Sequence, residues 1–233
     1  MFSMKKVLPV IAGALCALPF FASADEPMEK VLIAGDKNYC GYYSNMLKKQ
    51  FACTLIDKDN GEKDWKKKGY ILPKFEELKQ YKMIILSQFC TTLDVNRQDL
   101  IDYVKNGGTI YSSYQSGIFS MTRSQLKEPG YGIAGFKKYT GVCLTPYPKS
   151  GPMTHNLVYT KEMKKTREFQ FKTLYAVYAG ELTDAVPLVV NPEKKDLALA
   201  CVAKCGKGQL IYNGSTDESE LFFDILKACG VIK

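Results

Sequence analysis

Short apolar runs alternate with amphipathic segments along the first half of this chain. Leu100, Ile101 and Val104 share one helical face, and Gly107 and Gly108 supply a left-handed stop after it. Apolar runs bounded by turn residues are typical of buried parallel strands. The alternation predicts an α/β fold, flavodoxin-like and doubly wound, with a mostly parallel sheet. The predicted strands are 30–34, 53–57, 83–87 and 109–114, the predicted helices are 41–50, 73–80 and a segment capped by Asp94 or Asn96, and 57–69 is predicted to be loop.

Strand-like runs separated by short turns dominate the second half. Such a succession is typical of antiparallel strands, so a C-terminal antiparallel extension of the sheet is predicted. Residues 204–208 have the composition of a hairpin turn, and an amphipathic helix is expected to close the chain. The predicted strands here are 169–178, 185–190, 197–203 and 209–213, and the closing helix is 217–229.

The first residues have the pattern of an export signal. Lys5 and Lys6 precede an apolar stretch at 7–21, and Ala22-Ser23-Ala24 provides the small residues of a signal-peptidase site. We therefore expect a signal peptide at 1–24, a single domain at 25–233, and a bacterial protein that is periplasmic or secreted. No later apolar run approaches the ~18 residues that cross a bilayer, so no membrane attachment is expected after cleavage.

Charge and motifs argue against several classes of partner. The formal charge is +8, but the lysines are scattered rather than gathered with aromatics, which does not favour nucleic acid. Neither G-x-G-x-x-G nor a P-loop occurs, so no nucleotide cofactor is expected. Cys201 and Cys205 do not form Cys-x-x-Cys and no histidine cluster accompanies them, so no metal is expected either. The chain has eight cysteines, of which Cys16 lies in the expected leader, so at least one thiol must remain unpaired.

Polar residues gather where the fourth predicted strand ends. In such folds this strand-to-helix turn often presents a reactive side chain. Hydroxyl groups at Ser112, Ser113 and Ser116, beside Tyr114 and Gln115, suit a sugar whose ring stacks on an aromatic face. We expect these residues to bind a small polar ligand rather than to attack one. The interpretation of a serine as a nucleophile stays open as an alternative.

His155 is the only histidine, so histidine-based acid–base chemistry has to run through it. Two interpretations are open. In one, His155 is a loop residue that is hydrogen-bonded to backbone. In the other, it takes part in ligand binding, or acts with Ser113 or a neighbouring serine as a hydrolase, which requires the two side chains to meet.

Two cysteines are expected to meet at the same edge of the sheet. Cys40 lies close to the first predicted helix and Cys90 follows the third predicted strand, and those strands are neighbours in a flavodoxin-like order. In an exported protein the preferred interpretation is a disulfide between them. The alternative is a thiol protein in which the helix N-terminus lowers the pKa of Cys40. Tyr39, beside Cys40, is counted with both cysteines among the candidate ligand-binding residues.

Several segments give the chain a family resemblance: KVLIAGD, YKMIILSQ, LIDYVKNGGTIY, THNL and the late GKGQLIYNG. Together they cover most of the chain after the leader. The chain resembles the class I glutamine amidotransferase-like superfamily, particularly its trehalose-utilisation-type members and the trimerisation domain of certain β-galactosidases. The resemblance implies the α/β architecture.

The resemblance also implies where catalytic residues would stand. Active amidotransferases of this superfamily carry a cysteine at the elbow after the strand that matches 109–114, with a histidine and an acid near the last strand. This chain has serines, Tyr114 and Gln115 at the first place and Asn213 to Asp217 at the second. The catalytic triad is therefore expected to be missing. Glutamine hydrolysis is not expected either, because a serine without a positioned base is a poor nucleophile.

The function expected from the sequence is that of an exported, non-catalytic amidotransferase-like domain. It binds a small polar ligand, with carbohydrate among the candidates, or acts as an assembly module, so a homo-oligomer belongs to the expectations. The alternatives are a hydrolase that uses His155 with an elbow serine and a thiol protein that uses Cys40 and Cys90.

Overall fold

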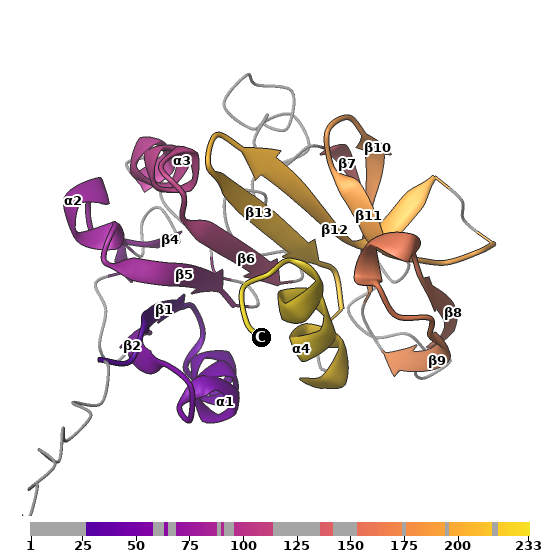
Figure 1. The fold of residues 1–233 in the computed structure, drawn as a ribbon, viewed down its shortest axis with the longest axis horizontal. Helices are drawn as coiled ribbons and strands as arrows, with labels where there is room; N and C mark the ends of the chain where they lie inside the picture. Colours follow the sequence, from indigo (N-terminus) through magenta and orange to yellow (C-terminus); the bar gives the residue numbers. More distant parts are fainter. Residues whose placement is uncertain are drawn as a thin grey trace, which may run out of the picture.

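The computed structural model of this protein contains a large mixed sheet covered by helices (Figure 1). The expected leader lies outside the described residues. None of the described helices is long and apolar enough to span a bilayer. The structure describes residues 27–57, 63–64, 69–87, 90, 96–113, 136–141, 153–173, 176–193, 196–215 and 219–233.

Five parallel strands form one half of the sheet. They are buried because helices cover both faces, and apart from β2 almost every position along them is inaccessible to solvent. This half confirms the prediction of an α/β fold with parallel strands. In spatial order the strands are β2 (Ala52–Ile56), β1 (Lys30–Ala34), β5 (Tyr81–Leu86), β6 (Thr109–Ser113) and β13 (Gly208–Asn213).

Two hydrophobic clusters lie on opposite faces of the sheet. Along β1, Leu32 and Ala34 join one cluster while Val31 and Ile33 join the other, as the alternation of a strand requires. The first cluster contains the buried residues of α2 (Phe75–Leu78) and α3 (Arg97–Lys105), and the second contains those of α1 (Lys37–Leu47) and α4 (Ser219–Ala228).

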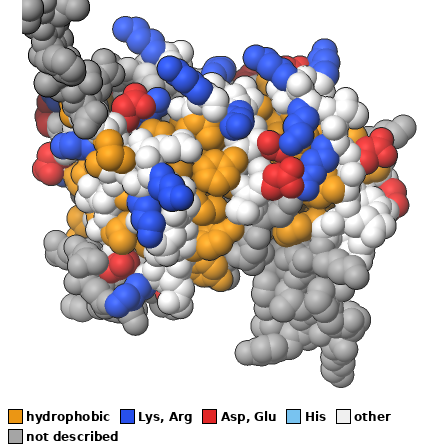
Figure 2. All heavy atoms as spheres, turned by 60° about the horizontal axis from the view of Figure 1, so that its bottom comes forward, with side chains coloured by type: hydrophobic (Ala, Val, Ile, Leu, Met, Phe, Trp, Pro, Cys, Tyr) orange, Lys and Arg blue, Asp and Glu red, His pale blue; other side chains and the backbone are white. Residues whose placement is uncertain are grey.

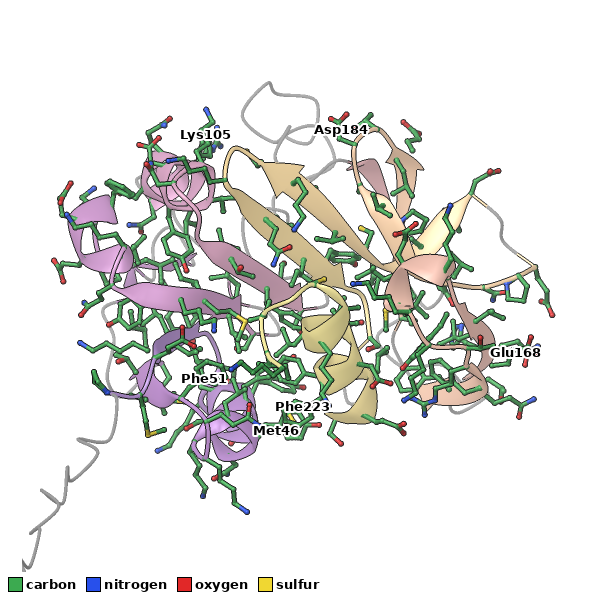
Figure 3. The ribbon with its side chains drawn as sticks, in the orientation of Figure 1. Met46, Phe51, Lys105, Glu168, Asp184 and Phe223 are labelled. Atoms are coloured by element: carbon green, nitrogen blue, oxygen red, sulfur yellow. The ribbon has the colours of Figure 1, made fainter. Side chains whose placement is uncertain are left out.

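The pair α1 and α4 lies below the sheet in Figure 1, and α2 and α3 lie above it. Met46 of α1 and Phe223 of α4 lie between the two lower helices (Figure 3) and pack against the second cluster. On the side of the molecule turned forward in Figure 2, hydrophobic side chains gather across the middle of the surface, with basic side chains around them.

Two helix starts follow from local chemistry. The Asp36 side chain accepts a hydrogen bond of 3.0 Å from the Asn38 amide, so α1 begins at Lys37, before its predicted start. Asn96 stands at the N-cap of α3 as predicted, but its side chain does not cap that helix. It bonds the backbone N–H and C=O of Leu72 instead, and so fixes the segment that enters α2.

The other half of the sheet is antiparallel and larger than predicted. It is joined to the parallel half by a hairpin between β12 and β13. The predicted C-terminal antiparallel extension is confirmed, but it makes up about half of the sheet, which is therefore mixed rather than mostly parallel. The single strand predicted at 169–178 is two strands with different partners, β9 and β10. The antiparallel strands are β7 (Phe136–Gly141), β8 (Met153–Tyr159), β9 (Glu168–Thr173), β10 (Val177–Leu182), β11 (Val186–Val190) and β12 (Leu197–Cys205).

Two smaller features complete the described fold. The predicted loop at 57–69 contains a short hairpin of β3 (Lys63–Asp64) and β4 (Gly69–Tyr70). One turn of 3-10 helix, η5 (Lys161–Met163), follows β8.

Candidate functional site

The carboxyl ends of the parallel strands lie along one edge of the sheet, where ligands bind in open α/β folds. Each strand delivers a polar residue to this edge. Asp36 follows β1, Asp57 follows β2, Ser87 follows β5, Ser113 ends β6, and Ser215 follows β13. This edge is therefore the candidate functional site, in agreement with the place that the sequence predicts.

The serines of the elbow are at the predicted place. Ser112 and Ser113 are the last two residues of β6, both are fully buried, and they lie opposite Tyr212 and Asn213 of β13. The other three elbow candidates, Tyr114, Gln115 and Ser116, lie outside the described residues.

Asn213 stands at the end of the last parallel strand, and its side chain is held from two directions. Its Nδ2 donates to the Tyr111 hydroxyl at 2.8 Å. Its Oδ1 accepts from the backbone N–H of Ser215 at 3.0 Å and from the Ser215 hydroxyl at 2.8 Å. This arrangement holds the turn after β13, and it gives no basic group to the neighbouring serines.

A second group of residues lies where β1 and β5 end side by side. The chain reverses its progress through the sheet between these strands, since β2 lies on one side of β1 and β5 on the other. Gly35 has a φ of 139°, and a Cβ there would lie 2.1 Å from Ser87 Oγ and 3.1 Å from Cys90 Cβ. Only glycine fits this close approach of the two strand ends.

Cys40 lies next to the ends of β1 and β5, with its sulfur 3.8 Å from Ser87 Oγ. It carries a free thiol, so the predicted disulfide between Cys40 and Cys90 is wrong, although both residues do border Ser87. The alternative, a thiol whose pKa is lowered by the helix N-terminus, is not supported either. Burial raises the pKa of Cys40 to about 12, and the hydrogen bond from Ser87 offsets only part of this effect. Tyr39, one residue earlier in α1, is half-buried.

Sequence reasoning missed two residues of this group. Tyr70 of β4 is buried, and its pKa is raised to about 12 by burial and by the nearby acidic groups of Cys90, Asp36 and Cys40. Asp57, just after β2, is also buried. Both belong to or border the segment predicted as loop, where the polar composition gave no signal for a buried phenol or carboxyl group.

His155 is a strand residue, which corrects the prediction of a loop histidine. It occupies an inward position of β8, and its Nδ1 lies 3.1 Å from the Tyr178 hydroxyl. In the sheet β8 is separated from β6 by β13, β12 and β11. The pairing of His155 with an elbow serine therefore stays a hypothesis with three strands between its members.

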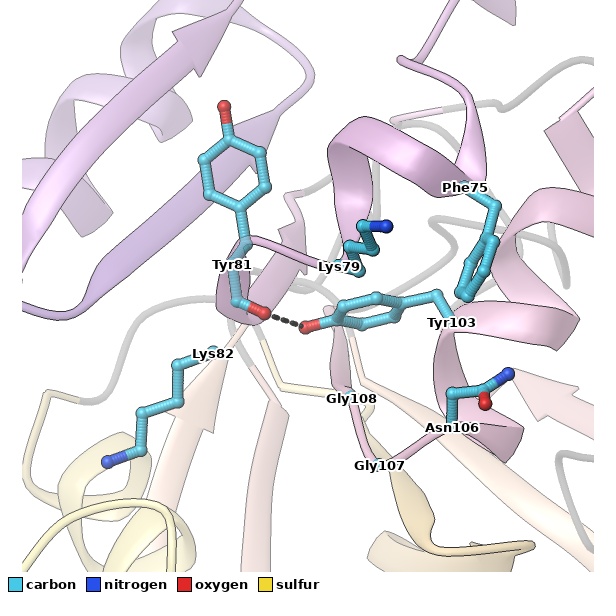
Figure 4. A pocket seen from close by; sticks show the side chains of 8 residues that line it. All are labelled: Phe75, Lys79, Tyr81, Lys82, Tyr103, Asn106, Gly107 and Gly108. Atoms are coloured by element: carbon cyan, nitrogen blue, oxygen red, sulfur yellow. Dashed lines mark hydrogen bonds between the residues drawn. The ribbon is translucent and has the colours of Figure 1, made fainter.

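A separate pocket of about 260 Å³ lies at the amino end of β5 and β6, away from the candidate site (Figure 4). The Tyr103 hydroxyl donates to the Tyr81 carbonyl oxygen at 2.9 Å along its wall. The two lysines that line it, Lys79 and Lys82, are paired with carboxylates of Glu76 and Glu29. The Tyr103 hydroxyl and both lysines are thus bonded to neighbouring protein groups, and we assign the pocket no catalytic or binding role. Across the described part of the chain, no three His, Cys, Asp or Glu side chains gather as metal ligands would.

Comparison with protein-family models gives no match, and comparison with curated proteins gives none either. Solved structures do match. Gan42B, a GH42 β-galactosidase from G. stearothermophilus, matches with a TM-score of 0.58 and 17% identity over 85% of this chain and 30% of its own. A β-galactosidase from Rahnella sp. R3 matches with a TM-score of 0.58 and 14% identity over 89% of this chain and 32% of its own. This chain thus spans about a third of the length of these enzymes.

A ThuA-like protein from Bacteroides uniformis matches nearly end to end, with a TM-score of 0.53 and 16% identity over 89% of this chain and 91% of its own. At such identities the comparisons establish the fold alone. They agree with the α/β architecture that the resemblance of the sequence implies.

Proposed function

We propose that this protein is an exported, non-catalytic domain of the amidotransferase-like fold that binds a small polar ligand, with carbohydrate the favoured class, at the carboxyl edge of β6 and β13. We infer that the topology of the parallel half of the sheet is flavodoxin-like. The strand order and the helices on both faces of the sheet support this inference.

The observation that carries the proposal is the side-chain arrangement of Asn213. Active relatives are expected to place a histidine near this strand end, and here both ends of an asparagine amide are bonded within the turn and to Tyr111. Ser112 and Ser113, across from it, receive no base from this strand, and a serine hydroxyl without a base is a poor nucleophile at neutral pH. Hydroxyl and amide groups at a strand end are well suited to directed hydrogen bonds with a polyol.

The test is calorimetric titration of the protein with galactose and with trehalose. We expect binding of at least one sugar and a loss of affinity of up to about tenfold in Ser113→Ala, the cost of one hydrogen bond. Thr54→Ala, an exposed substitution on β2, serves as control and is expected to bind as the wild type does. Ammonia release from glutamine is measured in parallel, and we expect none. Glutamine hydrolysis that depends on Ser113 would overturn the proposal.

An assembly module is the second candidate, favoured by the coverage of the β-galactosidase matches. Most of this chain corresponds to about a third of each of those enzymes, so the same fold occurs as one part of larger carbohydrate-acting chains. Sedimentation equilibrium at micromolar concentration tests it. A stable oligomer without sugar binding would favour assembly, and a monomer that binds sugar would favour the first proposal.

A further inference from the structure

The strand β9 forms one end of the sheet. Among the described strands it pairs with β8 alone. It lies at the lower right of the molecule in Figure 1, and its first residue, Glu168, is labelled at the outer margin in Figure 3. An outer strand of this kind is where a sheet can add a strand from another chain, because its outward backbone groups are available for pairing.

The backbone of β9 directs every second residue away from β8. The Tyr159 N–H donates to the Arg167 carbonyl oxygen at 2.9 Å, and in an antiparallel pair the bonded residues alternate along each strand. In the register of the two strands, Phe169 and Phe171 are therefore the residues that bond to β8. The N–H and C=O groups that point outward, and that suit a second ladder, belong to Glu168, Gln170 and Lys172.

The side chains of β9 give it one apolar and one polar face. Phe171 belongs to the second hydrophobic cluster and is buried, whereas Phe169 packs against that cluster and is half-buried. On the other face, Glu168 and Gln170 are exposed. A strand that pairs with this edge therefore has to supply apolar side chains on one face and polar ones on the other.

The strand β9 meets this requirement for itself. Its sequence begins E-F-Q-F-K, with an acidic residue two positions before Gln170 and a basic residue two positions after it. If two copies of β9 pair antiparallel about a two-fold axis at Gln170, Glu168 lies opposite the partner's Lys172 and Phe169 lies opposite the partner's Phe171. Opposite charges and aromatic pairs stabilise antiparallel strands. A slip of four residues would instead set like charges against each other, so the charges favour this register.

The other outer strands of the described sheet lack this complementarity. β7 has two adjacent lysines, Lys137 and Lys138, and no acidic residue. β2 has no charged residue, and both of its ends bond toward β1, so only Cys53 and Leu55 direct their backbone groups outward. Self-pairing is therefore favoured at β9.

We propose that β9 binds the β9 strand of a second copy of this chain, antiparallel and about a two-fold axis at Gln170, so that one sheet runs through both copies. The inference deepens the assembly function given above as the second candidate, since it names the partner and the surface. It makes no use of the carboxyl edge of β6 and β13. A strand of six residues is about 20 Å long, so the interface lies at the small end for specific complexes, and we expect a dimer that dissociates in the micromolar range.

The first test is sedimentation equilibrium of the protein from about 1 to 300 µM, at low and at high salt. We expect a reversible equilibrium between monomer and dimer that high salt weakens, because exposed ion pairs are screened. A protein that stays monomeric over this range overturns this inference and the assembly candidate together, and it leaves the proposal of sugar binding untouched.

The second test reverses the charges of β9. Glu168→Lys sets two basic side chains opposite each other in both symmetric pairs, and Lys172→Glu sets two acidic ones. We expect each variant alone to dimerise at least about tenfold more weakly than the wild type. An equimolar mixture of the two variants restores opposite charges in both pairs and should dimerise about as well as the wild type, which also shows that both variants are folded.

Glu77→Lys is the matched control, because it makes the same change of charge at an exposed residue of α2. It should dimerise as the wild type does. If the wild type dimerises and neither β9 variant weakens the dimer, or if mixing the variants restores nothing, the β9 surface is overturned while the assembly candidate stands.

The third test is a cross-link that reports the register. In the proposed dimer Gln170 lies opposite the partner's Gln170 with Cα atoms about 5.5 Å apart, a separation that a disulfide spans. Mild oxidation should therefore link Gln170→Cys into covalent dimers faster than the wild type. Thr54→Cys, at an exposed position of β2 at the opposite end of the sheet, is the control and should link no faster than the wild type. Linking of Gln170→Cys at the wild-type rate, or faster linking through Thr54→Cys, overturns the proposal.

Discussion

At the scale of single residues, two glycines in the same region should respond oppositely to alanine. Gly35→Ala places a methyl group 2.1 Å from Ser87 Oγ in a backbone conformation with φ of 139°. We therefore expect the free energy of unfolding to fall by about 1–3 kcal/mol. Gly41→Ala in α1 meets nothing within 4 Å and should raise the free energy of unfolding by about 0.5–1 kcal/mol, as Gly→Ala does in helix interiors. Urea denaturation measures both. A neutral Gly35→Ala would mean that the strand ends can separate freely.

Burial makes a prediction about the reactivity of Cys40. Its thiol is inaccessible, and with the pKa raised to about 12 the thiolate is scarce at pH 8. Iodoacetamide labelling of the native protein, read by peptide mass, should therefore modify half-buried Cys205 well before Cys40. The urea-unfolded protein, in which both cysteines should react, is the control. Labelling of native Cys40 at the rate of Cys205 would restore the thiol alternative.

The sequence predicts those site residues whose positions follow from local pattern. Ser112 and Ser113 lie at a strand end because an apolar run and its polar boundary define that end. Local pattern did not reveal the environment of His155, since its partner Tyr178 is 23 residues away on a strand that does not pair with β8. Tyr70 was missed for the same reason: a phenol in a polar segment is buried only by the tertiary arrangement.

At the scale of elements, α4 is fastened to the β8–β9 hairpin by a charge network. Asp224 accepts from the Tyr159 hydroxyl and from Lys165, both at 2.9 Å, and Arg167 binds Glu220 at 3.0 Å. Asp224 is 16% exposed and Glu220 is 57% exposed. We expect Asp224→Asn to lower the free energy of unfolding in urea by about 1–3 kcal/mol, because the partly buried Tyr159 hydroxyl and Arg167 then face a neutral amide in place of a carboxylate. Glu220→Gln should lose about 0–1 kcal/mol, and an equal loss would contradict this ranking.

The periodicity of apolar residues predicted most elements of the parallel half, but it predicted little about which strands pair in the antiparallel half. The strand at 30–34 was predicted with its observed bounds, since a buried parallel strand is one continuous apolar run. The prediction of one strand at 169–178 was wrong, because the residue pattern does not show which strand a segment pairs with. In the structure β9 pairs with β8, whereas β10 pairs with β12 and β7. Pairing partners depend on contacts between distant segments, which a local pattern does not contain.

At the scale of the whole molecule, the continuous sheet predicts that the two halves unfold together. Leu199 of β12 is fully buried and belongs to the cluster that also contains residues of α1, α4 and β1. Leu199→Ala should therefore cost about 2–5 kcal/mol. It should reduce native-state hydrogen-exchange protection in β1 and β5 by the same free energy as in β12, since one cooperative unit shares its stability.

Val186→Ala is the matched control for this prediction, because Val186 lies on β11 in the same half of the sheet but is 41% exposed. It should change protection by no more than about 0.5 kcal/mol. If Leu199→Ala weakened only the amides of β8 to β12 and left β1 and β5 at wild-type protection, the chain would consist of two separately stable units. The expectation of a single domain at 25–233 would then be wrong.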